Sequence, residues 1–180
     1  MKIDASYSEI IKQNSRESIF NPGPYNHCAK ANRIYLDELD EEIKTDLQLL
    51  TTTVLNKISK LFKDSFFVCL VTFTQEKSVF FPKEDLTQLT NCGIPLPIEF
   101  QFEQTYIELD EWYANYLFFK ESKTSLKRYV KGILATYLSE NEPYINLDVF
   151  FISNNLEKLV NLYDDRGMDI VELKTKPNKQ

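Results

Sequence analysis

The segment of this chain with the most potential for chemistry is LYDDRGMDIV, residues 162–171, where charged residues separate two apolar runs. Asp164, Asp165 and Arg166 could form a polar recognition point at a strand end, with Arg166 binding a carboxylate or phosphate through two parallel hydrogen bonds. A tight turn requires similar residues, because aspartates bond nearby backbone amides and Gly167 can adopt positive φ. Paired carboxylates could also hold a divalent metal, but no further ligand is identifiable. A site and a structural turn therefore both remain open.

Other catalytic arrangements find little support in the sequence. His27 is the single histidine and precedes Cys28, but adjacent residues of a strand point to opposite faces, so the two are poorly placed to act together. Cys69 and Cys92 could lie near His27 only if the fold brings these distant parts of the chain together. The odd cysteine count, without a C-x-x-C pair, argues against both a disulfide framework and a zinc site. The four glycines are too dispersed to form a phosphate-binding loop. We therefore expect no cofactor, no metal and no catalytic set.

Two groups of charged residues are candidate binding surfaces. A basic cluster surrounds the predicted start of a helix and either is solvated or holds an anion at the helix N-terminus; it comprises Lys120, Lys123, Lys127, Arg128 and Lys131. An acidic group is formed by residues that helix capping does not explain. Asp37 and Glu38, together with Glu99 and Glu103, could form one acidic face, although a solvated surface is the simpler interpretation.

The composition indicates a globular protein that binds neither nucleic acid nor membrane. The chain has 180 residues, of which 43% are hydrophobic, and its net charge is -6. Contact with phosphates requires a surplus of Lys and Arg, so the charge balance suits a basic protein partner better. The longest apolar run, residues 66–73, is too short to span a bilayer, and the first residues do not resemble a signal peptide. We expect a cytoplasmic protein.

Hydrophobic periodicity predicts the elements that must position these residues. We predict helices over residues 6–15, 43–61, 83–91 and 124–139, and strands over residues 29–39, 65–75, 97–107, 111–121, 144–153, 156–163 and 168–174. The two main helices carry apolar stripes, formed by Ile43, Leu47, Leu50, Val54, Ile58 and Leu61 in one and by Leu126, Val130, Ile133, Leu134, Tyr137 and Leu138 in the other.

Three strands have distinctive patterns. Residues 65–75 are apolar throughout, which is typical of a central strand buried on both faces. Residues 97–107 alternate, so Ile98, Phe100 and Phe102 should share an apolar face. Residues 144–153 and 156–163 should form a hairpin that turns at 154–155.

The order of elements predicts an α+β fold. A mainly antiparallel sheet of about five to seven strands should carry two main helices on one face. We expect an N-terminal helix and loop over residues 1–28, a single domain over residues 29–174 and a flexible tail over residues 175–180.

The C-terminal third also resembles a known family. The blocks YLFFKESKTSLKRYVKGILATYL, INLDVFFIS and KLVNLYDDRGMDIV are similar to the uncharacterised bacterial domain-of-unknown-function family 3885. The resemblance is most specific at YDDRGMD, which marks Tyr163, Asp164, Asp165, Arg166, Gly167 and Asp169. It is looser over residues 29–160 and absent over roughly the first 20. It implies a small soluble bacterial domain without an established activity.

Three functions remain in view. The favoured hypothesis is a non-catalytic binding protein, of the immunity or inhibitor type, that neutralises a basic toxin or enzyme. Its contact residues would be Asp37, Glu38, Glu99, Glu103, the loop Asp164–Arg166 and Asp169. The alternative is a domain that binds or acts on a small anionic or phosphorylated ligand through Arg166 and the Lys120–Lys131 cluster. A structural subunit with an exposed aromatic patch near Trp112 is a third possibility.

Overall fold

A computed structural model describes residues 20, 30–107, 111–139, 141–164 and 166–173. The elements follow one another as β1 (Ala31–Tyr35), α3 (Glu41–Thr45), α4 (Leu47–Ile58), η2 (Ser59–Leu61), β2 (Ser65–Thr74), α5 (Lys83–Asn91), β3 (Gln101–Ile107), β4 (Trp112–Ser122), η3 (Lys123–Ser125), α6 (Leu126–Leu138), β5 (Asp148–Ser153), β6 (Lys158–Leu162) and β7 (Gly167–Glu172). The predicted helix over 6–15 and the tail over 175–180 lie outside the described residues. None of the described helices is both long enough and apolar enough to cross a membrane.

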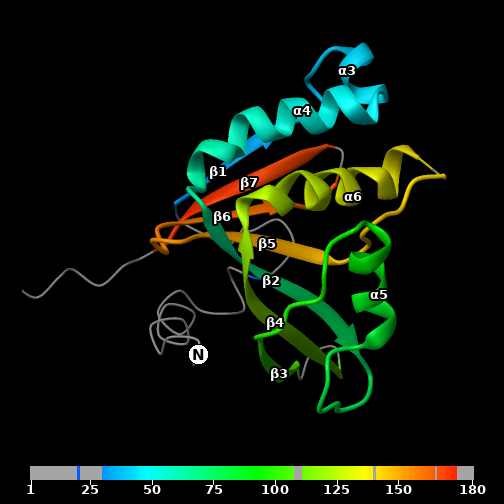
Figure 1. The fold of residues 1–180 in the computed structure, drawn as a ribbon, viewed down its shortest axis with the longest axis vertical. Coiled ribbons are helices and arrows are strands. Elements are labelled where there is room, and N and C mark those ends of the chain that lie inside the picture. The colour runs from blue at the N-terminus through cyan, green and yellow to red at the C-terminus, as the bar shows by residue number, and fades with distance from the viewer. Residues whose placement is uncertain (1–19, 21–29, 108–110, 140, 165, 174–180) are drawn as a thin grey trace, which may run out of the picture.

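The described strands form one seven-stranded sheet in the order β1-β7-β6-β5-β2-β4-β3, with every neighbouring pair antiparallel. The two main helices, α4 and α6, lie side by side across one face of the sheet (Figure 1). The α+β class, the antiparallel sheet and the shared helix face are therefore confirmed.

Alternation along β2 produces two apolar layers. Phe66, Val68 and Leu70 belong to the core between the sheet and the helices, whereas Cys69 and Val71 belong to a second apolar layer on the opposite face. All five are fully or almost fully buried, which confirms that this strand is covered on both sides. We refer below to the helix face and the second face of the sheet.

One predicted helix is divided in two. The stripe from Ile43 to Leu61 predicted a continuous helix, but the chain is extended at Asp46, between α3 and α4. The Asp46 carboxylate accepts hydrogen bonds from the backbone N–H groups of Gln48 and Leu49, at 2.7 and 2.9 Å. Asp46 is therefore an N-cap, a position that aspartate favours over the helix interior.

The connection between β5 and β6 is longer than predicted. Four residues, 154–157, separate the two strands instead of the two-residue turn expected at 154–155. The backbone N–H of Leu156 donates to the Ser153 carbonyl at 2.8 Å, and Leu156 has a φ of 60°. The Ser153 hydroxyl also accepts from the N–H of Lys158 at 2.9 Å. These hydrogen bonds satisfy backbone N–H groups in and next to the four-residue loop.

Candidate functional site

The YDDRG segment folds as a turn between β6 and β7 that its own side chains hold closed. Asp164 is buried, and its Oδ1 accepts from the backbone N–H groups of Arg166 and Gly167, at 2.8 and 3.1 Å. Its Oδ2 accepts from Nε and Nη2 of Arg166, at 2.8 and 2.6 Å. The Arg166 side chain is nevertheless 74% exposed. Asp165 lies outside the described residues. The local geometry thus gives Asp164 and Arg166 a structural role without any ligand.

Gly167 is required for packing and not for backbone conformation. The sequence suggested a positive φ here, but Gly167 does not adopt one; Gly93, with a φ of 72°, does. A Cβ on Gly167 would instead collide with the Tyr163 hydroxyl and lie 2.9 Å from its Cζ. The Tyr163 ring thus lies directly against the turn backbone, which leaves no room for a side chain at position 167.

Asp169 forms an ion pair that sequence reasoning missed. The β1–β7 register places Arg33 opposite Asp169, and the Arg33 Nε and Nη2 donate to its two carboxylate oxygens at 2.9 and 3.0 Å. Asp169 is fully buried, and the Arg33 guanidinium also lies 5.3 Å from the centre of the Tyr163 ring. The hydrogen bond to Asp169 raises the pKa of Arg33 above its usual value. Burial, followed by the negative charge of Asp169, raises the pKa of Tyr163. This cluster fastens the edge strand β1 to β7.

The four acidic residues predicted as one face occupy opposite edges of the sheet. Asp37 and Glu38 follow β1 and are exposed, whereas Glu103 is on β3 and Glu99 lies two residues before its first residue. Because neighbouring strands are about 4.8 Å apart, roughly 25–30 Å separates the two edges. The single acidic face is therefore wrong. Asp37 lies instead beside the YDDRG turn, where its backbone N–H donates to the Arg166 carbonyl at 3.3 Å.

The basic cluster and Arg166 do not form one anion site. Tyr137, in the last turn of α6, donates its hydroxyl to the Tyr163 carbonyl at 3.2 Å, so the YDDRG turn lies near the C-terminal end of that helix. Lys127 is in the first turn, about 15 Å away along the axis. Arg128 donates to the Gly93 carbonyl at 2.9 Å, and Lys131 pairs with Glu142. The contacts needed for the anionic-ligand alternative are therefore not assembled.

The remaining candidates for catalysis are not brought together either. His27 and Cys28 lie outside the described residues. Cys69 is fully buried in the second apolar layer, and burial raises the pKa of the half-buried Cys92 thiol, which disfavours the thiolate. Within the described part of the chain, no group of three or more His, Cys, Asp or Glu side chains could hold a metal ion.

An exposed apolar surface next to β3 is a feature that the sequence pattern concealed. The alternation over 97–107 placed Ile98 and Phe100 on a buried face, but the strand begins only at Gln101. Ile98 is 98% exposed and Phe100 is 55% exposed. They adjoin a small pocket of 170 Å³ lined by Val79, Phe80, Phe81, Leu86, Leu96, Pro97, Phe100, Phe102 and Leu117. We call Val79, Phe80, Leu96, Ile98 and Phe100, all large and all exposed, the apolar patch.

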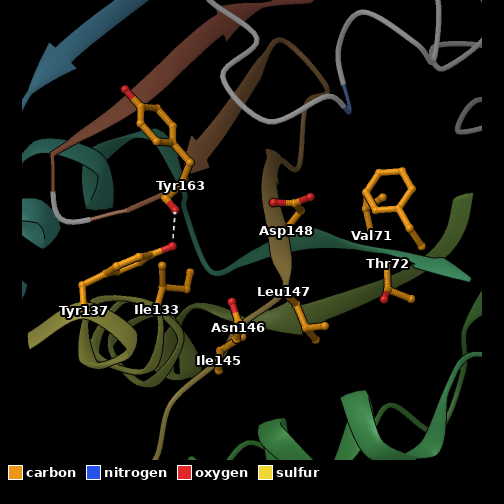
Figure 2. Close-up of a pocket in the computed structure, with 10 residues that line it drawn as sticks. Val71, Thr72, Ile133, Tyr137, Ile145, Asn146, Leu147, Asp148 and Tyr163 are labelled. Atoms are coloured by element: carbon orange, nitrogen blue, oxygen red, sulfur yellow. Dashed lines mark hydrogen bonds between the residues drawn. The ribbon is translucent and has the colours of Figure 1, made fainter. Parts of the chain in front are cut away.

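A second pocket, of 210 Å³, lies where β5 begins (Figure 2). Its lining includes Asp148 from β5, Thr72 from β2, Tyr137 from α6 and Tyr163 beyond β6. The sequence predicted Tyr137 in a buried stripe, but it is 49% exposed and forms one wall of this pocket. Burial raises the pKa of Asp148 from 3.8 to about 6. Figure 2 shows its carboxylate between the two tyrosines on one side and β2 on the other.

Some of the missed residues carried a detectable signal. Arg33 and Asp169 carry opposite charges in the interior of segments predicted as strands, and a charge at an inward position of a strand needs a partner. Asp148 is likewise the only acid within the apolar run INLDVFFIS. The exposure of Phe80 could not be predicted, because no pattern in residues 76–82 indicates whether this loop is buried or exposed.

Comparison with family models places the chain in one family. The model of the domain of unknown function DUF3885 matches residues 26–178. Because this match covers most of the 180 residues, the chain belongs to that family, as the YDDRGMD resemblance had indicated. Comparison with curated proteins and with solved structures gave no match.

Proposed function

We propose that this DUF3885 protein binds another protein without catalysing a reaction, and that β3 and the apolar patch form its binding surface. The observation that carries the proposal is the exposure of five large apolar side chains beside the edge of a sheet. Exposed apolar side chains gathered around one pocket are uncommon on a soluble monomer away from an interaction site.

The position of the patch indicates how a partner would dock. Among the described strands, β3 pairs only with β4, so its outer edge can accept a further strand. Backbone hydrogen bonds along such an edge supply affinity, and neighbouring pockets supply specificity. The pocket beneath Phe80 and Phe100 could take one apolar side chain from the added strand. The partner would therefore present an extended segment with an apolar anchor residue.

The charge of the surface favours a basic partner. Glu99 lies between Ile98 and Phe100, Glu103 is two residues into β3, and the whole chain has a net charge of -6. Such charges increase the rate of encounter with a basic protein. An inhibitor or immunity-type role against a basic toxin or enzyme is our more specific proposal. Asp37, Glu38 and the Asp164–Arg166 turn would lie outside this surface, on the far edge of the sheet.

A binding experiment with matched variants tests the proposal. The tagged protein would be used to capture partners from the lysate of its host, beside Phe80→Gln/Ile98→Gln, Glu99→Lys/Glu103→Lys and the control Leu49→Gln. Leu49 is also an exposed leucine, 41% exposed, but lies on α4. We expect a stoichiometric partner that the control retains, that the apolar variant loses and that the charge-reversed variant binds more slowly.

Two outcomes would contradict the proposal. A partner captured equally well by the Phe80→Gln/Ile98→Gln variant would place the interface elsewhere. Self-association of the parent that this variant abolishes would mean that the apolar patch serves a second copy of the chain and not a different protein. The inhibitor role requires, in addition, that the purified partner loses its activity when the parent protein is added.

A further inference from the structure

The pocket at the start of β5 contains a carboxylate that no described residue neutralises. No residue that the structure describes donates a hydrogen bond to Asp148 or forms an ion pair with it. The other residues that line the pocket include no Lys, Arg or His. An ionised carboxylate that is partly withdrawn from water and unpaired is costly, and the cost is recovered when a cation binds.

The walls of the pocket suit an organic cation. Tyr137 and Phe73 are among its lining residues, and tyrosine and phenylalanine rings attract cations through their faces. Tyr163 contributes its carbonyl, which accepts from the Tyr137 hydroxyl, while its ring points away from the pocket (Figure 2). A second carboxyl group, Asp85 on α5, accepts a hydrogen bond from the hydroxyl of Thr72, another lining residue, and burial raises its pKa too. A metal ion is a poorer fit, because no group of three candidate ligands exists among the described residues.

The pocket is formed before any ligand arrives. Its floor is the segment 145–147, which precedes β5. The Ile145 N–H donates to the Gly132 carbonyl at 2.9 Å, and the Ile145 carbonyl accepts from the Thr136 hydroxyl at 3.0 Å, so α6 holds this segment. From α5, the Gln88 side chain accepts from the Asn146 N–H at 2.6 Å. A preformed pocket loses little conformational entropy on binding.

We propose that the Asp148 pocket binds a primary ammonium or guanidinium group on a short alkyl chain. The cation would pair with the Asp148 carboxylate, and the alkyl chain would lie against the Tyr137 ring. At 210 Å³ the pocket is smaller than those that enclose drug-sized ligands, so it would take one such group and not a large molecule. The cation comes either from a free amine or from a Lys or Arg side chain of a protein.

Titration with butylammonium tests the proposal, with binding observed by saturation-transfer NMR. Neutral 1-butanol and anionic butyrate are the controls for charge, and Asp148→Asn is the matched variant, because it preserves shape and removes the negative charge. We expect butylammonium to bind the parent, and to bind Asp148→Asn about ten- to hundredfold more weakly, the usual effect of losing a charge-assisted hydrogen bond.

The pH dependence supplies a second criterion. Binding should strengthen as the pH rises from 5 to 7, because Asp148, with a pKa of about 6, becomes ionised. The other residues with titratable side chains that line the pocket are Tyr137, from α6, and Tyr163, beyond β6, while Asp85 on α5 is hydrogen-bonded to the lining residue Thr72. The Asp148→Asn variant should show a weaker pH dependence.

A capped lysine distinguishes the two possible sources of the cation, a free amine and a protein side chain. Nα-acetyl-lysine N-methylamide that binds as well as butylammonium would indicate a protein side chain, whereas its rejection would indicate a free amine. Equal binding of butylammonium by parent and Asp148→Asn, or no binding at millimolar concentration, would overturn the proposal. The pocket shares no lining residue with the apolar patch, so Phe80→Gln/Ile98→Gln should still bind butylammonium, whatever the fate of the proposed protein interface.

Discussion

The substitution Asp148→Asn should make the protein more stable at neutral pH. Burial raises the pKa of Asp148 from 3.8 to about 6, so the folded state holds this proton more tightly than the unfolded state does. Each pH unit of such a difference corresponds to about 1.4 kcal/mol, which gives an upper value of about 3 kcal/mol. Because the side chain is only partly buried, water screens some of this cost, and we expect a gain of about 1–2 kcal/mol.

The dependence on pH fixes the sign of the effect. Below about pH 3, Asp148 is protonated in both states, so parent and variant should be similarly stable. As the pH rises from about 3 to 7, the unfolded state ionises first, and the free energy of unfolding of the parent should fall relative to that of Asp148→Asn. Above about pH 7 both states are ionised, and the difference should remain constant.

Urea denaturation at several pH values, followed by circular dichroism, measures this difference. The control is Asp64→Asn, because Asp64 is an exposed carboxylate and its substitution should leave the stability nearly unchanged at every pH. If Asp148→Asn were less stable than the parent at pH 7, the carboxylate would have a favourable partner in the folded protein. Both the unpaired carboxylate and the cation site would then be refuted.

Three further substitutions test the structural role of individual contacts, each by urea denaturation. Asp169→Asn should cost about 3 kcal/mol, because it leaves Arg33 without its buried partner, and a loss below 1 kcal/mol would contradict the ion pair as drawn. Gly167→Ala should cost about 1–3 kcal/mol through collision with the Tyr163 ring, and Tyr163→Phe should restore part of the loss; additive effects would disprove the contact. Asp46→Ala should cost about 1 kcal/mol by removing the N-cap of α4, whereas Asp46→Asn should retain most of the stability.

The sequence predicted the elements well because the apolar periodicities are strong. The strand over 65–75 and the helix over 83–91 correspond closely to β2 and α5. The sequence did not predict the interruption between α3 and α4 at Asp46, because the apolar stripe continues on both sides of it. Such a stripe indicates only which face of a helix packs against the core. A side-chain cap is a local competition between hydrogen bonds, and hydrophobic periodicity carries no information about it.

The surfaces were less predictable because they depend on the order of the strands. Asp37 and Glu103 could be placed on one face only by assuming that their strands are neighbours, and the sheet order places them on opposite edges. The same order creates the pair of Arg33 and Asp169, which are 136 positions apart in the chain. Alternation gives the face of a strand on which a residue lies, but not the strand that lies next to it.

The distribution of charges separates structural from functional candidates in this fold. Asp169 and Asp164 are buried and satisfied by Arg33 and Arg166 in turn, so their contribution to folding is sufficient to explain their presence. Among the described residues, none pairs with the Asp148 carboxylate, and the side chains of the apolar patch are exposed. Both features are expected to lower stability or solubility, and neither is needed to form the sheet. A binding role that offsets these costs explains both features, which is why the decisive experiments concern the β3 edge and the start of β5 and not the YDDRG turn.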